Sequence, residues 1–328
     1  MSSQQSILAI PAFGIIAEHL DQVRKLISRQ LSAPSNADAV DRLLKYVDSS
    51  DGKMIRPGLV LLSGAACGAV TDQHIHVGAV FELIHTATLL HDDVIDDGRT
   101  RRGRPTVNSR WGNESAVLVG DFLLSRVFRM SADLPRAAAR AIADAAISVC
   151  DGELRQVSQR RNFQLNESQY IDIIANKSAS LFSSCCYLGA ELAKAGSTRA
   201  AALREFGLNA GIAFQITDDL LDVVGDETSM GKTLGTDLKN SKLTLPLIHL
   251  LGTTEDGLRS RVEAMLGDGA DGRAELRDLL HSNGSLDYAR DKSRQYIDKA
   301  LRPLESIDQS EARTALGEIA NFVGDRIA

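Results

Sequence analysis

Apolar residues recur every three or four positions along most of the chain, a spacing that places them on one face of a helix. Alanine and leucine are abundant, prolines number only seven, and no run alternates β-branched with polar residues as a strand would. We therefore predict an all-α protein. The predicted helices cover residues 7–32, 37–48, 55–70, 74–97, 113–131, 135–160, 167–195, 199–224, 241–251, 255–266, 272–282, 286–306 and 309–327.

Three segments, 75–90, 178–192 and 206–224, are apolar on more than one face. A helix of this kind is buried on several sides, so it belongs in the middle of a bundle. No linker rich in proline, glycine or serine and no internal repeat separates the two halves of the sequence. We expect one large helical bundle, with residues 1–328 forming a single domain.

The long helix predicted over 167–195 has recognisable signals at both ends. Asn166 precedes it and is a favourable N-cap residue, because its side chain can accept a hydrogen bond from the first turn. Gly196 follows the last apolar turn and suits the left-handed conformation in which many helices end.

Four aspartates end another of the apolar helices, in the stretch LLHDDVIDDG at 89–98. Asp92 and Asp96 share a helix face, where like charges cost about 0.2–0.5 kcal/mol per pair. Gly98 is expected to stop the helix, so the carboxylates lie near the negative end of its dipole. A bound cation would offset both costs.

A second aspartate group, in AFQITDDLLDVVGD at 213–226, repeats this arrangement. Asp218 and Asp222 share a helix face, and Asp219 is adjacent. One such group could be a solvated helix end, but two on strongly apolar helices indicate a shared purpose. Mg²⁺ binds through one or two carboxylates together with waters and substrate phosphates. We therefore predict two facing groups that hold a diphosphate through metal ions.

Basic residues flank both groups, in or near three polar segments at 49–58, 98–106 and 225–242. Arginine suits bidentate phosphate contacts, and lysine acts as a point charge. Any one of them alone is more often a surface residue, so the prediction depends on their shared placement. The residues are Lys53, Arg56, Arg101, Arg102, Lys177, Lys232 and Lys242. Metals, cations and an apolar interior favour the departure of diphosphate from an apolar substrate, with the Phe214 ring facing the carbocation.

Charge and cysteine usage narrow the class of protein. The formal net charge is −6 and no long basic run occurs, which argues against a nucleic-acid partner. Cys67, Cys150, Cys185 and Cys186 have no metal-ligand spacing, so we expect buried, reduced thiols, as in a cytoplasmic protein. No targeting sequence and no stretch of about 18 apolar residues occurs, so we expect no transmembrane segment. A peripheral membrane contact stays open.

These residues resemble the trans-isoprenyl diphosphate synthase, or polyprenyl synthetase, family over about residues 40–305. The resemblance is carried by DGKMIRP, ELIHTATLLHDDVIDDGRTRRGRPT, GDFLL, GELRQ, YIDIIANKSASLF, GIAFQITDDLLDV, GKTLGTDLK and KLTLPLI. It implies a helical bundle of the isoprenoid synthase type, three Mg²⁺ ions per active site and a homodimer, for which the helix at 113–131 could form the seam. The implied reaction condenses isopentenyl diphosphate with an allylic prenyl diphosphate.

The resemblance also assigns roles to individual residues. It makes Asp92, Asp93 and Asp96 the first metal-binding motif and Asp218, Asp219 and Asp222 the second; Arg101, Lys177, Lys232 and Lys242 contact the allylic diphosphate, while Lys53, Arg56, His85 and Arg102 bind isopentenyl diphosphate. Gln215 matches a glutamine before the second motif. Ser178 replaces the family's threonine and keeps its hydroxyl. The variants DGK for GGK and NSK before LTLP remove no charged position.

Product length is the sharper question. In the family, residues four and five positions before the first motif form the floor of the elongation cavity. Here they are Thr88 and Ala87, both small, so we predict a long product of roughly seven to ten isoprene units, such as a quinone side-chain precursor in ubiquinone biosynthesis. A lower floor is expected at Phe122, Phe128 or Met130. The alternative is a medium-chain geranylgeranyl or farnesyl diphosphate synthase.

Other readings explain fewer residues. Glu82 and His85 form one Glu-x-x-His, but a di-iron protein needs a second such motif and two more glutamates. An all-α metal phosphohydrolase could use His91 and Asp92, which leaves the second aspartate group unexplained. A terpene cyclase would not need a separate isopentenyl site. A regulatory subunit of a hetero-oligomer would have lost acidic motifs that are intact here.

Overall fold

The computed structural model describes residues 11–32, 38–49, 52–224, 241–268 and 273–325. Lys232 and Asp226 therefore lie outside the described residues. The elements are η1 (Pro11–Ile16), α2 (Ala17–Gln30), α3 (Asp38–Asp48), α4 (Ile55–Cys67), α5 (Asp72–Ile95), β1 (Thr100–Arg101), β2 (Arg104–Pro105), α6 (Val107–Trp111), α7 (Asn113–Ala132), α8 (Arg136–Ser158), α9 (Glu167–Ile174), η2 (Ala175–Ala179), α10 (Ser180–Leu192), α11 (Ser197–Val224), α14 (Leu245–Thr253), α15 (Asp256–Asp268), α16 (Arg273–Ser282), α17 (Ser285–Leu304) and α18 (Glu311–Asp325).

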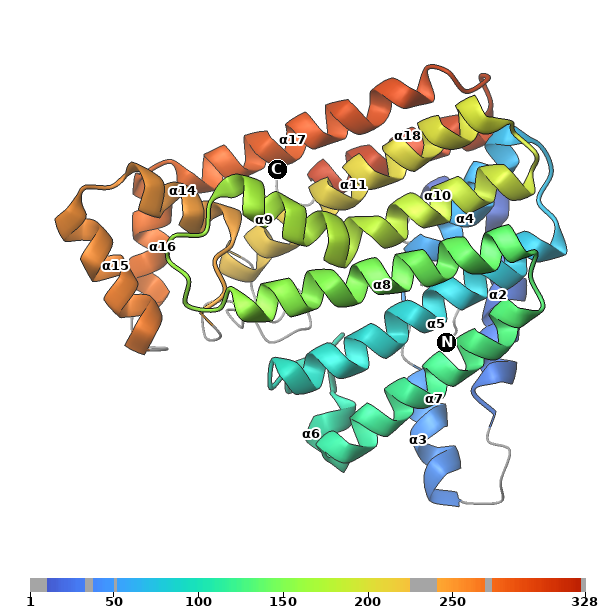
Figure 1. Ribbon diagram of the computed structural model, residues 1–328, viewed down its shortest axis with the longest axis horizontal. Coiled ribbons are helices and arrows are strands. Elements are labelled where there is room, and N and C mark those ends of the chain that lie inside the picture. The colour runs from blue at the N-terminus through green and yellow to red at the C-terminus, as the bar shows by residue number, and fades with distance from the viewer. Residues whose placement is uncertain (1–10, 33–37, 50–51, 225–240, 269–272, 326–328) are drawn as a thin grey trace.

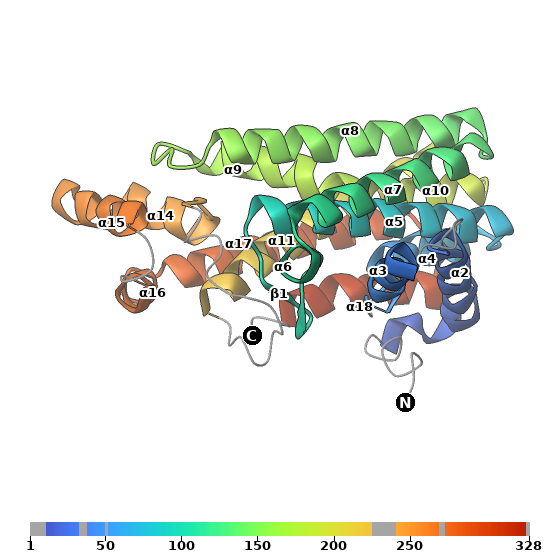
Figure 2. The same ribbon diagram turned by 90° about the horizontal axis from the view of Figure 1, so that it is seen from below.

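Long helices lie side by side along the main axis of the molecule (Figure 1). Helix α10 packs against α4, α8 and α11, and α11 packs in turn against α17. The shorter helices α14, α15 and α16 lie at one end of the bundle, as both views show (Figure 2). The predicted all-α bundle is confirmed, since a two-stranded hairpin is the sheet that the described residues form.

The helices predicted to be central are buried. Phe81 of α5, Phe182 of α10 and Phe206 of α11 are almost wholly inaccessible to solvent. Gly207 lets α10 and α11 approach closely, because a Cβ there would lie 2.5 Å from the carbonyl oxygen of Phe182. A larger side chain would push the two helices apart. Helix α11, which carries the second aspartate group, therefore packs closely on α10, and it also packs on α17.

The segment predicted as one helix over 167–195 is divided. Asn166 caps α9 as predicted, accepting a 3.0 Å hydrogen bond from the backbone of Gln169. Residues 175–179 then form a π-helical turn before α10 begins at Ser180. Gly152 of α8 packs directly on this turn, since a Cβ there would lie 2.3 Å from the backbone nitrogen of Lys177. Periodicity over a long window does not detect one widened turn, and such turns often occur at functional sites.

The first polar segment after α5 is more ordered than a solvated loop. Helix α5 ends at Ile95, and Asp97, not Gly98, takes the left-handed conformation with φ of 50°. Strands β1 and β2 then pair through a turn at Arg102 and Gly103, whose φ values are 54° and 70°. Two positive φ values are what a two-residue hairpin turn requires. This turn places Arg102 beside α4 and α5.

The sequence predicted buried, reduced cysteines and no transmembrane segment. All four cysteines are free thiols, and Cys185 and Cys186 are buried, but Cys67 is half-buried and Cys150 is exposed. The prediction of burial was wrong for Cys150 because its face of α8 borders a cavity. Across the described residues, none of the helices combines the length and apolar character needed to cross a membrane.

Candidate active site

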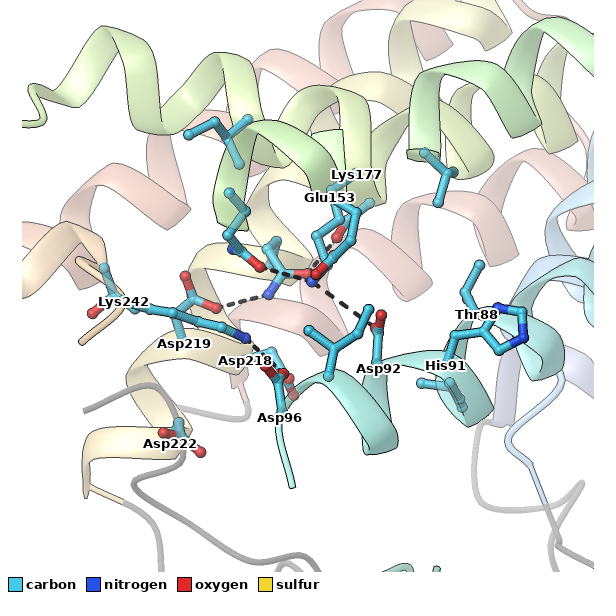
Figure 3. Close-up of a pocket in the computed structure, with 18 of the residues that line it drawn as sticks. Thr88, His91, Asp92, Asp96, Glu153, Lys177, Asp218, Asp219, Asp222 and Lys242 are labelled. Carbon is cyan, nitrogen blue, oxygen red and sulfur yellow. Dashed lines mark hydrogen bonds and ion pairs between the residues drawn. The ribbon is translucent and has the colours of Figure 1, made fainter. Parts of the chain in front are cut away.

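Both aspartate groups line one cavity of about 570 Å³ near the carboxyl ends of α5 and α11. Figure 3 shows Asp92 on one side and Asp219 and Asp222 on the other, with Asp96 and Asp218 overlapping between them in this view. Within the described part of the chain, no three acidic, histidine or cysteine side chains gather closely enough to form a metal cage. Mg²⁺ does not require one, because substrate phosphates and waters complete its coordination. The opposed carboxylates therefore fit this ion.

Asp93 is held by Arg101 of the hairpin. The guanidinium donates from Nη2 to Oδ1 at 2.7 Å and from Nε to Oδ1 at 3.0 Å. Burial raises the pKa of Asp93, and the bonds from Arg101 partly oppose that shift. Because Asp93 is buried and ion-paired, its carboxylate fixes the hairpin against α5.

Asp96 lies just beyond the end of α5, and two cations among the described residues hold its carboxylate. Lys242 Nζ donates to Oδ2 at 2.6 Å, and Arg160 Nη2 donates to Oδ1 at 2.9 Å. Lys242 is almost fully buried, with its side chain 6% exposed, so its ammonium group faces inward toward the cavity. One carboxylate therefore joins the segments that follow α8 and precede α14.

Lys177, on the π-helical turn, reaches toward the first motif. Its Nζ lies 3.9 Å from Asp92 Oδ2, forms an ion pair with Glu153 of α8 and donates to Gln156 Oε1 at 2.8 Å (Figure 3). Burial alone would lower the pKa of Lys177, but Asp92 and Glu153 outweigh it and raise the pKa. Burial raises the pKa of Asp92, although Lys177 opposes the shift. The lysine is therefore charged at neutral pH.

Among the described residues, two neutral side chains donate to an aspartate of the second motif. Tyr170 of α9 donates to Asp219 Oδ2 at 2.6 Å, and Gln215 Nε2 donates to Oδ1 at 2.7 Å. Ser178 in turn donates to Gln215 Oε1 at 2.5 Å, which fixes the orientation of the amide. Ser178, which replaces the family's threonine and keeps its hydroxyl, thus supports the second motif through Gln215. Asp222 is buried at the next turn of α11.

His85, one of the residues assigned to isopentenyl diphosphate, lies near the middle of α5, away from the aspartates at its carboxyl end. His85 and Arg56 line the cavity, and the Arg56 guanidinium lies 5.2 Å from the Phe182 ring centroid. Burial, then Arg56 and Arg102, lower the pKa of His85 well below its usual range, so it is neutral at pH 7. Glu82, also buried, raises the pKa of Arg56, although burial outweighs it and the pKa is lowered. Such surroundings suit an anion and not a di-iron centre.

Lys53 and Arg102 are both exposed, and neither belongs to the cavity lining that the described residues form. The Lys53 Nζ lies 5.6 Å from the Phe322 ring centroid of α18. The charge of Arg102 acts on Glu82 and His85 of α5. Of the four residues assigned to isopentenyl diphosphate, Arg56 and His85 are the two that line the cavity.

The cavity lining also includes apolar side chains and the small Thr88. These residues are Thr88, Val149, Leu154 and Phe214. Ala87, by contrast, is fully buried in the core and is absent from the lining that the described residues form. Of the two predicted floor positions, Thr88 is the one that faces the cavity.

The lower floor expected on the helix at 119–130 stays a prediction. None of Phe122, Phe128 and Met130 belongs to the lining contributed by the described residues. Met130 is buried in the core, whereas Phe128 is 71% exposed. Helix α7 packs on α5, and none of its residues belongs to the cavity lining that the described residues form.

Four residues that hold the site were not identified from the sequence: Glu153, Gln156, Arg160 and Tyr170. The signal for Glu153 and Gln156 was present in GELRQ, a polar motif on an otherwise apolar helix. Tyr170 begins another quoted motif, but its hydroxyl partner lies 49 positions away. Arg160 lies in an unremarkable polar turn after α8, and no local pattern marks it.

Comparisons with known proteins agree with this geometry. The polyprenyl synthetase family model matches residues 37–282. The octaprenyl diphosphate synthase of Escherichia coli is 33% identical, with 95% of this chain and 97% of that protein covered. A short chain isoprenyl diphosphate synthase of Methanothermobacter thermautotrophicus is 34% identical, with 87% and 90% covered.

A crystal structure gives the same result for the fold. The polyprenyl synthase of Caulobacter crescentus, complexed with calcium and isoprenyl diphosphate, superposes with a TM-score of 0.90 at 32% identity, and 97% of each chain is covered. Its all-α isoprenoid synthase fold is therefore the fold of this chain. The chain belongs to the polyprenyl synthetase family and is a prenyltransferase.

Proposed function

We propose that this protein is a Mg²⁺-dependent trans-prenyltransferase that condenses isopentenyl diphosphate with an allylic diphosphate to make a long-chain all-trans polyprenyl diphosphate. One observation carries the proposal. Carboxylates of the α5 and α11 motifs line one cavity together with Arg101, Lys177 and Lys242 and with apolar side chains such as Val149 and Phe214. This arrangement suits a substrate with a diphosphate head and a hydrocarbon tail.

The residues act by position and charge. The two motifs hold Mg²⁺ ions, three by the family resemblance, which when bound neutralise charge developing on the departing diphosphate. Lys177 and Lys242 add fixed positive charge at the same end of the cavity. Phe214, packed 5.3 Å from Phe182 between ring centroids, presents an aromatic face to the allylic carbocation and excludes water. The isopentenyl double bond then attacks, and the released diphosphate accepts the proton.

Arg56, His85 and Arg102 are proposed to bind the second diphosphate. Neutral His85 can donate one hydrogen bond without adding charge, while the two arginines supply the charge. Lys53 and Lys232 complete the assignments that the resemblance makes. Nothing in this arrangement requires a nucleophilic side chain, because the leaving diphosphate and the double bond supply the chemistry.

A long product is proposed because Thr88, which lines the cavity, has a small side chain. A tail that passes Thr88 meets no bulky side chain at that position, so elongation continues toward the length made by the octaprenyl relative. The short-chain relative keeps the medium-chain alternative in view. The phosphohydrolase reading is less favoured, because His91 bonds to the backbone oxygen of Val117 and approaches Asp121 of α7.

A homodimer is also proposed. Helices α7 and α8 expose large apolar side chains that a second copy could cover: Val117, Leu118, Phe128, Ile147, Leu154 and Val157. Each chain is proposed to be a single domain, since α11 contributes Ala213 to one core cluster and Ile212 to the other. Sedimentation of wild-type protein and of Phe128→Glu tests the interface: the variant should be monomeric, and an unchanged dimer contradicts the assignment.

The deciding experiment is product analysis by mass spectrometry. Purified protein is incubated with isopentenyl diphosphate, an allylic starter and Mg²⁺, and prenyl diphosphates of about seven to ten units are expected. Thr88→Phe should shorten the product because it narrows the cavity wall, and Ala87→Phe tests the neighbouring position. No elongation by the wild type, alone or with a partner chain, contradicts the function. An unchanged product length in both variants contradicts only the assignment of Ala87 and Thr88 to the floor of the elongation cavity.

A further inference from the structure

The third aspartate of the first motif needs an external support. Asp96 follows the last residue of α5, and its backbone has φ of −101° and ψ of 4°. The next residue, Asp97, is in the left-handed region. The backbone N–H of Asp96 still donates to the carbonyl oxygen of Asp92 at 2.8 Å, but the residue lies beyond the last helical position of α5. Side chains from other segments therefore orient its carboxylate.

Two segments supply that support and are joined to each other. The backbone N–H of Arg161 donates to the carbonyl oxygen of Ser241 at 3.1 Å. Both residues have positive φ values, 61° and 50°, which non-glycine residues adopt at an energetic cost. The residues immediately beside them, Arg160 and Lys242, are the ones that bind Asp96. The strained junction thus places two cations on the two oxygens of one carboxylate.

The two cations are not equivalent. Lys242 lines the cavity, where a diphosphate would bind, whereas Arg160 is not part of the lining that the described residues form. Arg160 also donates to the backbone oxygen of Ile95 at 3.4 Å, so it contacts the end of α5 as well as the Asp96 carboxylate. Its Nε is buried and donates to none of the described residues. Lys242 is placed to leave Asp96 for a substrate, and Arg160 is placed to stay.

We propose that Arg160 is the positioning residue of Asp96: it keeps Oδ1 while Lys242 releases Oδ2 for a metal ion and turns to the diphosphate. Carboxylates that bind metals are in turn hydrogen-bonded, and loss of such a partner costs about 10–100-fold in metal affinity or activity. The inference rests on the proposed function, because it gives Asp96 a metal to bind.

The test compares Arg160→Gln with wild-type protein by calorimetry, using inorganic pyrophosphate at a series of Mg²⁺ concentrations. The Mg²⁺ concentration for half-maximal pyrophosphate binding should rise about tenfold or more in the variant. Arg160→Lys keeps the charge and should recover part of the difference. Arg155→Gln is the matched control, because this arginine of α8 forms an exposed pair with Asp151, and it should behave as wild type.

Enzyme assays give the second readout. In Arg160→Gln the requirement for Mg²⁺ should shift in the same direction, excess Mg²⁺ should restore turnover, and KM for isopentenyl diphosphate should not change. A lower thermal stability with unchanged Mg²⁺ dependence would make Arg160 a structural residue only and overturn the proposal. Absence of activity in the wild type, by contrast, is a failure of the proposed function, which the calorimetry does not depend on.

Discussion

The two aspartate motifs have similar sequences but are supported in different ways. Helix α11 continues to Val224, beyond Asp222, whereas α5 ends at Ile95, before Asp96. In the first motif, cationic side chains hold Asp93 and Asp96; in the second, the neutral Tyr170 and Gln215 donate to Asp219. A continuous helix fixes the backbone of the second motif through Asp222, whereas Asp96 of the first motif lies beyond the last residue of its helix.

The largest expected effect is the loss of a carboxylate from the second motif. Asp219→Asn removes a metal-binding charge, so kcat should fall about 10²–10³-fold. Steady-state kinetics at saturating Mg²⁺ measures it. Asp172→Asn, at an exposed position on α9, is the control and should keep full activity. A loss below about tenfold would mean that the second motif is not essential.

The neutral support of that motif can be removed separately. Tyr170→Phe deletes the hydroxyl that donates to Asp219, so we expect a 10–100-fold loss in metal affinity or activity, with the fold retained. Circular dichroism and a Mg²⁺ titration measure the two properties. Tyr288→Phe is a matched control, since its hydroxyl bonds to Glu167 outside the cavity lining. Equal effects of the two variants would contradict the role of Tyr170.

Removal of a cation from the first motif should affect stability. Arg101→Gln leaves the buried Asp93 without its ion-pair partner and should lower the free energy of unfolding by about 2 kcal/mol. Urea denaturation measures it. In the double variant Arg101→Gln/Asp93→Asn no uncompensated charge remains, so part of the stability should return. Additive losses in the double variant would show that the two residues do not interact.

The smallest effect concerns pH. Burial raises the pKa of Asp92, so the folded protein binds a proton there more tightly than the unfolded chain does. The resulting stability is present below the usual value of 3.8 and is lost as pH rises through the raised pKa. In the presence of a chelator, Asp92→Asn should therefore be more stable than wild type at neutral pH by about 1 kcal/mol. Equal denaturation midpoints across that pH window would contradict this.

Several parts of the site could be predicted because their signals are local. Asn166 is recognised as an N-cap from the residues beside it, and the aspartate groups are recognised from their spacing along one helix. The hairpin turn at Arg102 and Gly103 also has a local signal, an arginine–glycine pair in a polar segment, although it was assigned to a loop. The π-helical turn at Lys177 was not predicted, and its close contact, Gly152, lies on another helix.

The sequence by itself determined that the chain is helical and which helices are central. It also indicated that two groups of carboxylates bind a diphosphate. Both results follow because periodicity and residue chemistry are properties of neighbouring positions. The tertiary structure decided what supports each carboxylate. Arg160 and Asp96 are 64 positions apart, and Lys242 and Asp96 are 146 apart. Such contacts depend on how helices pack and where they end, and no pattern within a single segment contains that information.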